Sequence, residues 1–338
     1  MNYKTEILSP TDENIEKAGR LLKSGEVVGI PTETVYGLAA DATNPEAVSK
    51  IFKAKGRPQD NPLIVHIADK SDIEKYAKDI PDIAYRIADK FWPGPITMVL
   101  PKKDVIPETT SGGLDTVGLR FPSNTIAKKI IKSAGVPLAA PSANLSGKPS
   151  TTTAGHVFDD MNGKIPAIID GGTCSVGVES TVISFSGDSV IILRPGFISR
   201  EDLLTVADDV IIDKGVLSEI SNDVVVASPG MKYKHYSPKA NVIIVDGEYN
   251  EFVEFFEKNY SDGVYAMIFG NETDKFPYPH FSYGTTDSEQ AAELFDKLRI
   301  IDKMNAKTVY VRCPSKDGVG LAVYNRLIRA AGFEVIKL

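Results

Sequence analysis

The sequence predicts an α/β protein: a twisted mixed sheet flanked by helices, followed by a small Rossmann-like parallel α/β domain. Helical and strand-like segments alternate along all 338 residues, and a chain of this length suits about two domains. Up to about residue 200 several strands follow one another directly, which is typical of a mixed sheet. After residue 241 helices and strands alternate strictly, which is typical of a doubly wound parallel sheet.

The first part of the chain supplies helices and a sheet of roughly seven strands. Helices are predicted where apolar residues recur at helical spacing, at 12–24, 44–56, 71–80, 81–92, 125–135 and from about 199. The second helix has the clearest ends, because Asn44 suits the N-cap, Pro45 the first turn and Gly56 the C-cap. Strands are predicted from apolar runs at 26–32, 62–68, 95–102, 116–122, 136–144, 167–172, 180–187 and 189–196.

The boundary between the two domains is predicted inside 206–241. The stretch SPGMKYKHYSPKAN at 228–241 is weakly patterned and rich in Pro, Lys and Tyr. Beyond it the chain reads β-α-β-α-β-α-β, which makes 242–338 a domain of its own. The predicted division is therefore a first domain at 1–205, a linker at 206–241 and a C-terminal domain at 242–338.

The composition limits the functions to consider. Hydrophobic residues make up 42% and charged residues 25% of the sequence, which are ordinary values for a globular domain. The formal net charge of −7 argues against a broad nucleic-acid surface, so any anion site must be local. No apolar run approaches the roughly 20 residues that cross a bilayer, and the N-terminus lacks a signal-peptide core. Cys174 and Cys313 match no zinc or CxxC spacing, so we expect a reduced, cytoplasmic protein.

The most unusual polar stretch is KAKGRPQDNP at 53–62, a cationic turn stiffened by two prolines. Lys53 is expected to be a solvated residue on the preceding helix. Lys55 and Arg57 flank Gly56 and can project from one tight turn. Cations near a helix C-terminus also suit the helix dipole, so a purely structural role stays open. The stiffness of the turn favours an anion-binding loop.

Two further loops carry polar side chains at the ends of predicted strands. PTETVYGLAAD at 31–41 could offer the hydroxyls of Thr32, Thr34 and Tyr36 to a small ligand, or could simply be a hydrogen-bonded turn. APSANLSGKPST at 140–151 combines small residues with two prolines. It is either a surface loop or a set of backbone N–H groups that binds an anion.

Two arginines also lie at strand ends, each just before a proline. Arg120 occurs in GLRFP and Arg194 in LRPG. Together with Lys55, Arg57 and Lys148 they predict a pocket of five cations, which would fit a polyanion such as a nucleoside triphosphate.

The linker contains His235 and Tyr236, for which two roles are open. The tyrosine either packs between the domains or belongs to a lid that excludes water from a labile intermediate. The familiar nucleotide and hydrolase motifs do not help, because the sequence has no GxxxxGK[ST], GxGxxG, HExxH or GxSxG.

Six motifs in fixed order resemble those of the YrdC-like family over residues 10–205. They are PTETVYGL, the turn KGR followed by NPL, GLRFP, APSANLSG, ESTVI and RPG. The linker PGMKYKHYSP and the C-terminal GLAVYNRLIRAAG resemble the longer, two-domain members. The resemblance implies that the first domain is catalytic and that 206–241 acts as an active-site lid.

The resemblance implies an L-threonylcarbamoyladenylate synthase, a nucleotidyltransferase. Such enzymes condense L-threonine, bicarbonate and ATP to threonylcarbamoyl-AMP and pyrophosphate. A downstream complex then transfers the threonylcarbamoyl group to the adenosine next to the anticodon of tRNAs reading ANN codons, giving t6A. Mg2+ is expected to arrive with the ATP phosphates rather than on protein side chains, and direct contact with tRNA is compatible with this role.

The family motifs also imply roles for individual residues. L-threonine would be held by Thr34, His66, Arg120, Ala140 and Thr181. ATP would contact Arg57, Asn61, Thr116, Ser142, Ser150, Arg194 and Tyr236. The predicted catalytic residues, which complete the KxR and SxN motifs, are Lys55, Arg57, Ser142 and Asn144. Their common task is to supply fixed positive charge and orientation where negative charge accumulates.

Two alternatives to this function stay open from the sequence. The cationic cleft could belong to a non-catalytic RNA- or tRNA-binding module. The chain could also form a different carbamoyl adenylate, as the hydrogenase-maturation relatives do. Those relatives carry extra acylphosphatase and zinc-finger regions, and two cysteines cannot supply the latter.

Overall fold

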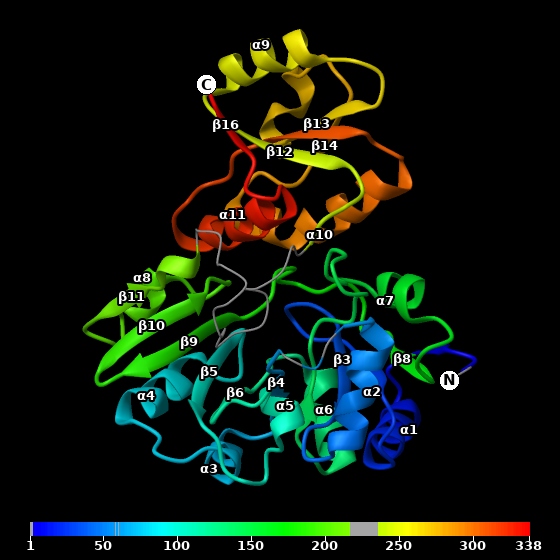
Figure 1. Cartoon of the computed structure of the whole chain (residues 1–338), viewed down its shortest axis with the longest axis vertical. Coiled ribbons are helices and arrows are strands. Elements are labelled where there is room, and N and C mark those ends of the chain that lie inside the picture. Colours follow the sequence, from blue (N-terminus) through cyan, green and yellow to red (C-terminus); the bar gives the residue numbers. More distant parts are fainter. Residues whose placement is uncertain (1–2, 58, 60, 217–235) are drawn as a thin grey trace.

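The chain folds into two sheets that are separated by a pair of helices (Figure 1). The computed structural model describes residues 3–57, 59, 61–216 and 236–338. Helices α10 (Asp287–Lys303) and α11 (Gly318–Ala330) belong to the C-terminal part and face the first sheet. The predicted combination of a twisted mixed sheet with a parallel C-terminal domain is confirmed.

The first sheet is mixed and has eleven strands among the described residues. Their spatial order is β1 (Glu6–Leu8), β8 (Ala167–Ile169), β2 (Val28–Ile30), β3 (Gly37–Asp41), β7 (Leu138–Ala139), β4 (Ile64–His66), β6 (Thr116–Arg120), β5 (Ile96–Pro101), β9 (Thr181–Ser186), β10 (Ser189–Arg194) and β11 (Val210–Ile212). The prediction of roughly seven strands was too low. It lacked β1, β3 and β11, which have three to five residues each and little apolar alternation.

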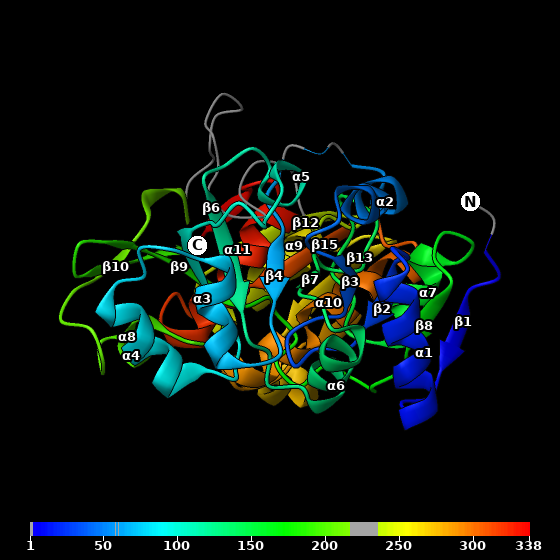
Figure 2. The same ribbon diagram turned by 90° about the horizontal axis from the view of Figure 1, so that it is seen from below.

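Helices cover both faces of this sheet. They are α1 (Asp12–Lys23), α2 (Pro45–Lys55), α3 (Ile73–Tyr76), α4 (Asp82–Phe91), α5 (Glu108–Ser111), α6 (Thr125–Ala134), α7 (Ala154–Met161) and α8 (Arg200–Leu203), with 3₁₀ turns at Lys70–Asp72 and Lys214–Val216. Because successive strand residues point to opposite faces, Leu38 packs in the same cluster as α2 and Ala39 packs in the cluster of α1 and α6. Figure 2 shows α1 and α6 together on their side of the sheet.

The ends of α2 place the KGR turn. The Asn44 side chain accepts hydrogen bonds from the N–H groups of Glu46 and Ala47, with Pro45 in the first turn. At the other end Gly56 adopts φ 66°, a left-handed conformation that suits glycine. Both predicted ends are confirmed, and the turn leaves the helix directly toward the edge of β4.

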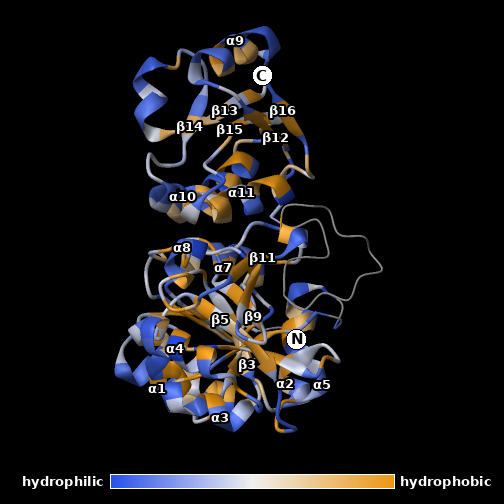
Figure 3. Ribbon diagram, turned by 90° about the vertical axis from the view of Figure 1, so that its left-hand side faces the viewer, coloured by the Kyte–Doolittle hydropathy of each residue, from blue (hydrophilic) through white to orange (hydrophobic). Residues whose placement is uncertain are grey.

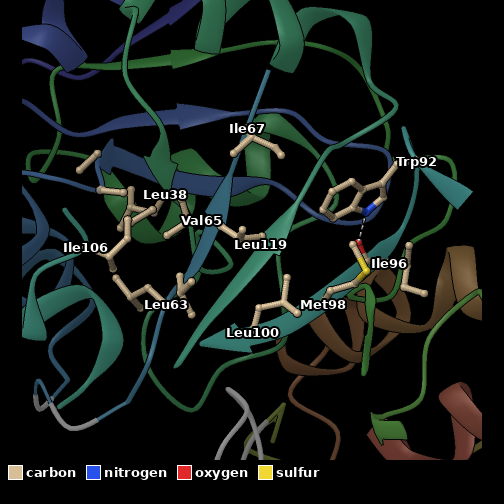
Figure 4. Packing of buried hydrophobic residues seen from close by; sticks show 14 of the residues in the cluster. Leu38, Leu63, Val65, Ile67, Trp92, Ile96, Met98, Leu100, Ile106 and Leu119 are labelled. Carbon is tan, nitrogen blue, oxygen red and sulfur yellow. Dashed lines mark hydrogen bonds between the residues drawn. The ribbon is translucent and has the colours of Figure 1, made fainter. Parts of the chain in front are cut away.

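The core of the first domain fixes the middle strands. Leu38, Leu63, Val65 and Leu119 are buried side by side (Figure 4), and hydrophobic colour concentrates on the strands in Figure 3. The indole N–H of Trp92 donates to the carbonyl of Ile96 at 2.9 Å. Strands β4 and β6 are therefore held on a rigid base, and their polar ends emerge from it.

The C-terminal domain is a five-stranded parallel sheet, one strand more than predicted. Its order is β14 (His280–Ser282), β13 (Val264–Ile268), β15 (Thr308–Arg312), β12 (Asn241–Asp246) and β16 (Val335–Lys337), with a 3₁₀ turn at Gly270–Lys275. Helix α9 (Tyr249–Asn259) packs on one face through Phe252 and Phe256. Helices α10 and α11 pack on the opposite face.

The predicted linker at 206–241 contains a piece of the first sheet. Strand β11 lies within it and pairs in parallel with β10, so this sheet continues beyond residue 205. The rest of the predicted lid lies largely outside the described residues, and its role stays a prediction. No helix in the described part of the chain is long and apolar enough to span a membrane.

Candidate active site

One pocket gathers most of the predicted site residues. It holds about 690 Å³ of space free of protein atoms, part of it open to solvent. Its polar lining residues are Thr34, Lys55, Arg57, His66, Arg120, Ser142, Asn144, Ser146, Glu179, Ser180, Arg194 and Tyr236. The backbone at Ala140 and the apolar side chains of Val35 and Ile64 complete the wall.

Sheet register brings His66 and Arg120 together. Strands β4 and β6 are parallel, and His66 lies opposite Arg120 at the ends of both. Burial, and then the positive charge of Arg120, lower the pKa of His66 to about 3, so its imidazole is neutral at physiological pH. His66 Nδ1 and Arg120 Nε are buried and have no hydrogen-bond partner within the part of the chain that the structure describes. A buried polar atom needs a hydrogen-bond partner, which a water molecule or a ligand can supply at a pocket wall.

Arg120 is fixed by two neighbours in the PTETVYGL turn. Its Nη1 donates to Thr34 Oγ1 at 2.9 Å and its Nη2 donates to Glu33 Oε1 at 2.7 Å. Burial raises the pKa of Glu33, but the charge and hydrogen bond of Arg120 outweigh it and hold that pKa below its usual value. The sequence prediction missed Glu33. Its burial could not be seen in the sequence, and only a buried carboxylate needs an arginine or lysine partner.

Of the three hydroxyls expected in this turn, Thr34 alone lines the pocket. The hydroxyl of Tyr36 donates to the carbonyl of Gly172 at 2.7 Å and accepts from the N–H of Gly171 at 3.0 Å. Thr32 Oγ1 donates to the carbonyl of Val35. Of the two alternatives for this stretch, the hydrogen-bonded turn holds for Thr32 and Tyr36, because both hydroxyls hold the turn in place.

Lys55 joins the KGR turn to the loop at 140–151. Its Nζ donates to the carbonyl of Ser142 and, at 2.7 Å, to that of Asn144. Burial, and then the charge of Arg57, lower the pKa of Lys55 well below its usual value. The Asn144 amide donates to the carbonyls of Leu145 and Lys148, and its Oδ1 has no partner among the described residues. The KxR and SxN motifs thus form one unit.

Four of the five predicted cations line the pocket. Arg57 lies 5.6 Å above the Phe52 ring, a cation–π contact that orients its guanidinium. The fifth, Lys148, is half exposed and pairs instead with Asp160 at 3.1 Å, so its assignment to the pocket was wrong. Pro58, expected to stiffen the KGR turn, lies outside the described residues.

Arg194 lines the same pocket from the end of β10. Its Nε and Nη2 donate to the carbonyl of Ser180 at 3.1 and 3.0 Å, and burial lowers its pKa to about 10. Glu179 also lines the pocket and accepts a hydrogen bond from Ser150 Oγ at 2.5 Å. Glu179 is a second functional residue that the sequence prediction missed, although it is the first letter of ESTVI.

Tyr236 lines the pocket from the C-terminal side. It is buried, its ring centroid is 5.1 Å from that of Phe295 in α10, and its backbone has φ 63°. Burial, and then the charge of Glu179, raise its pKa to about 12, so the phenol stays protonated. Its neighbour His235 lies outside the described residues.

Four predicted site residues are not part of the pocket lining: Asn61, Thr116, Ser150 and Thr181. Ser150 Oγ donates to Glu179 Oε1 beside the pocket. Thr181 Oγ1 donates to the carbonyl of Ile198 at 2.7 Å and accepts from its N–H at 3.1 Å, so it holds the RPG loop. Thr116 begins β6 opposite Pro101. Asn61 is buried just after the KGR turn. Their predicted ligand contacts stay predictions. Among the described residues no group of three or more His, Cys, Asp or Glu could hold a metal ion.

Two family models match nearly the whole chain. The Sua5/YciO/YrdC model, described as "Telomere recombination", matches residues 20–196. The model described as "Threonylcarbamoyl-AMP synthase, C-terminal domain" matches residues 198–332.

Named relatives are similar over their full length. Threonylcarbamoyl-AMP synthase of Pyrococcus abyssi is 44% identical over 331 residues, which cover 96% of both chains. That of Bacillus subtilis is 42% identical and covers 98% of this chain and 97% of its own. The structure of P. abyssi Sua5 complexed with L-threonine is similar with a TM-score of 0.91, at 41% identity and over 100% and 99% of the two chains. The chain is therefore an enzyme and belongs to the Sua5/YrdC family of threonylcarbamoyl-AMP synthases.

Proposed function

We propose that this protein condenses L-threonine, bicarbonate and ATP to threonylcarbamoyl-AMP and pyrophosphate, the product serving t6A formation beside the anticodon of tRNAs reading ANN codons. The observation that carries the proposal is the pocket itself. It joins three arginines and the buried Lys55 to a neutral imidazole in a chain that is 44% identical to a threonylcarbamoyl-AMP synthase over 96% of its length. Because the relatives are enzymes, the alternative of a purely RNA-binding module loses its support.

We assign the Thr34, His66 and Arg120 side of the pocket to L-threonine, with Ala140 and Thr181 as further contacts. The buried, unpartnered Arg120 Nε suits a carboxylate, because a guanidinium N–H donates strongly to an anionic oxygen. His66 is neutral and can accept a hydrogen bond from, or donate one to, a polar group of the amino acid. P. abyssi Sua5, which has been solved as a complex with L-threonine, shares this fold.

The other side of the pocket is assigned to ATP. Arg57, Asn61, Thr116, Ser142, Ser150, Arg194 and Tyr236 are the proposed contacts. Arg57 and Arg194 stand on different loops, so a triphosphate between them would be held from two directions. Mg2+ enters this proposal as part of the MgATP substrate, carried by the phosphates, since the described residues offer no carboxylate cluster for it.

The reaction needs no covalent enzyme intermediate. The threonine amine adds to bicarbonate with loss of water, giving an N-carboxylate. One of its oxygens attacks the α-phosphorus of ATP, a new P–O bond forms, and the bond to the β-phosphate oxygen breaks to release pyrophosphate. The attacking carboxylate and the triphosphate are both anionic. Lys55, Arg57, Ser142 and Asn144 form one unit at the junction of the two halves, and their proposed role is to position these anions and offset their repulsion.

Pyrophosphate release tests this proposal. We expect release to require L-threonine, bicarbonate and MgATP together, and mass spectrometry should detect threonylcarbamoyl-AMP. Release that is unchanged when L-threonine or bicarbonate is omitted would contradict the proposed substrates. The downstream transfer complex and any direct tRNA contact are further proposals, to be tested by reconstituting t6A on tRNA.

A further inference from the structure

The wall around Glu179 contains an arginine from the other domain. Arg326 lies in α11 of the C-terminal domain and is fully buried. Its Nε donates to Glu179 Oε2 at 3.0 Å and its Nη2 donates to the Glu179 carbonyl at 3.4 Å. Its Nη1 donates to the carbonyl of Pro195, the residue after Arg194. One guanidinium thus ties together the ESTVI and RPG motifs.

Glu179 in turn touches residues that we assign to ATP. Its Oε1 accepts the hydrogen bond of Ser150, while Oε2 is taken by Arg326. Burial raises the pKa of Glu179. The positive charges of Arg326 and then Arg194 outweigh this effect and hold the pKa below its usual value, so the group is an ionised carboxylate. Arg194 itself donates to the neighbouring Ser180. The carboxylate therefore lies between two arginines and is bonded to the one outside the pocket.

This arrangement decides how much positive charge the nucleotide side presents. Glu179 carries one negative charge, and Arg194 and Arg326 carry one positive charge each. With Arg326 in place, its charge offsets that of Glu179. Without Arg326, Glu179 would be a buried, uncompensated carboxylate on the nucleotide side of the pocket, and it would repel an anionic ligand.

The C-terminal domain packs closely against the loops of the first domain that carry Glu179 and Pro195, which allows Arg326 to reach both. A side chain at Gly177 would place its Cβ 2.3 Å from Cα of Ala292 in α10, so only glycine fits there. Val35, Val176 and Val178 of the first domain pack in one cluster with Phe295 and Leu298 of the second.

A second arginine of the C-terminal domain holds the next loop. Arg299 of α10 donates to the carbonyls of Pro149 and Ser150 and to Asp160 Oδ2. The contact between the domains therefore combines close apolar packing with direct hydrogen bonds to the loops of the first domain.

We propose that Arg326 is a positioning residue of the nucleotide half of the pocket: it holds Glu179, offsets its negative charge, and through Glu179 fixes the hydroxyl of Ser150. The C-terminal domain is thereby a part of the active site without touching substrate. This inference rests on the proposed function, because the anion it concerns is ATP.

Calorimetric titration of the full-length protein with MgATP and, separately, with L-threonine tests the inference. We expect R326M to weaken ATP binding on the order of tenfold, as truncated buried charge pairs do, and to leave threonine binding within about twofold. Adding E179Q should restore ATP affinity to within about threefold, because an amide keeps the Ser150 hydrogen bond and no longer carries a negative charge. If R326M does not fold, E179Q/R326M compared with E179Q carries the test, and the two should bind ATP equally.

The matched control is R312M. Arg312 is also buried in the same domain and pairs with Glu272, at 3.1 Å; neither residue lines the pocket. We expect this variant to lower thermal stability and leave ATP affinity unchanged. Equal loss of ATP and threonine binding in R326M, no rescue by E179Q, or the same ATP defect in R312M would overturn the inference. A wild-type protein that binds no ATP would instead overturn the proposed function.

Discussion

The two halves that we propose for the pocket, one for L-threonine and one for ATP, balance their buried arginines in different ways. Each has a buried arginine at a strand end and a glutamate from a nearby loop. In the threonine half, Glu33 bonds the site arginine itself, Arg120, and leaves its Nε for a ligand. In the nucleotide half, Glu179 bonds Arg326 from the C-terminal domain. The first half is complete within one domain, whereas the second depends on both.

The difference teaches what each glutamate does. An amino acid carries one carboxylate, so one restrained guanidinium with one available N–H is enough to orient it. A triphosphate carries several negative charges, so an uncompensated carboxylate would weaken the site. Moving the counter-charge to a second domain leaves more positive charge in the nucleotide half.

The largest expected effect is that of R57A, which removes a cation from the nucleotide half. We expect at least a 10²-fold loss of adenylate formation, as for other groups that stabilise developing charge, with the fold unchanged. The matched control is K53A, because Lys53 is exposed on the same helix and should be dispensable. Initial rates of pyrophosphate release measure both. Wild-type turnover in R57A would remove the pocket assignment.

The E33A variant should weaken threonine binding and lower the stability of the protein. Removing one member of a buried ion pair costs about 3 kcal/mol or more, because Arg120 would be left buried and uncompensated. We expect lower stability in urea unfolding and a raised KM for threonine. The apparent KM for ATP should change much less, and an equal change in both constants would contradict the separation of the two halves.

The same pair predicts a pH dependence. The pKa of Glu33 is lowered in the folded state, so its contribution to stability is present above the unfolded value of about 4.3 and is lost as pH falls through the folded value. The difference in unfolding free energy between wild type and E33Q should therefore shrink on acidification. A difference that is constant from neutral pH into the acid range would argue against an ionised Glu33.

Lys55 predicts a proton linkage at the junction of the halves. Its pKa is lowered by burial and by Arg57, and a bound triphosphate would raise it again. ATP binding should therefore take up a proton, and affinity should fall as pH rises through the pKa in the complex. Titrations in buffers of different ionisation enthalpy measure the uptake. The K55M variant should lose this part of it, and equal uptake in both proteins would refute the linkage.

The smallest expected effect is that of Y236F. The phenol is protonated, since its pKa is about 12, and the ring packs on Phe295 in either variant. We expect a change in the KM for ATP of about threefold, typical of one lost neutral hydrogen bond. Y236A, which also removes the ring, should be several times worse. Unchanged kinetics in Y236A would show that Tyr236 only packs between the domains.

Much of this structure was predictable from local signals. The caps of α2, the parallel C-terminal sheet and the residues that turn into the pocket follow from patterns within about ten residues. The short strand β3 was missed because its residues read as a polar turn, and its pairing with β2 and β7 decides its conformation.

The sequence also could not predict which residues pair with the buried charged side chains. Glu33 and Arg120 are 87 residues apart, and Glu179 and Arg326 are 147 apart. No local pattern encodes such pairs, and an acidic residue in a loop reads as solvated until its burial is known. The prediction for Lys148 was wrong in the opposite sense. From the sequence this lysine was taken to bind the ligand, but in the structure it pairs with Asp160.

The most direct test of the two-halved pocket is a structure of the protein with L-threonine and a non-hydrolysable ATP analogue. The threonine carboxylate should lie within hydrogen-bond distance of Arg120 Nε, with His66 beside the amino acid. The triphosphate should lie between Arg57 and Arg194, with Glu179 still bonded to Arg326. A threonine bound away from Arg120, or a Glu179 turned onto Arg194 in the complex, would contradict this account.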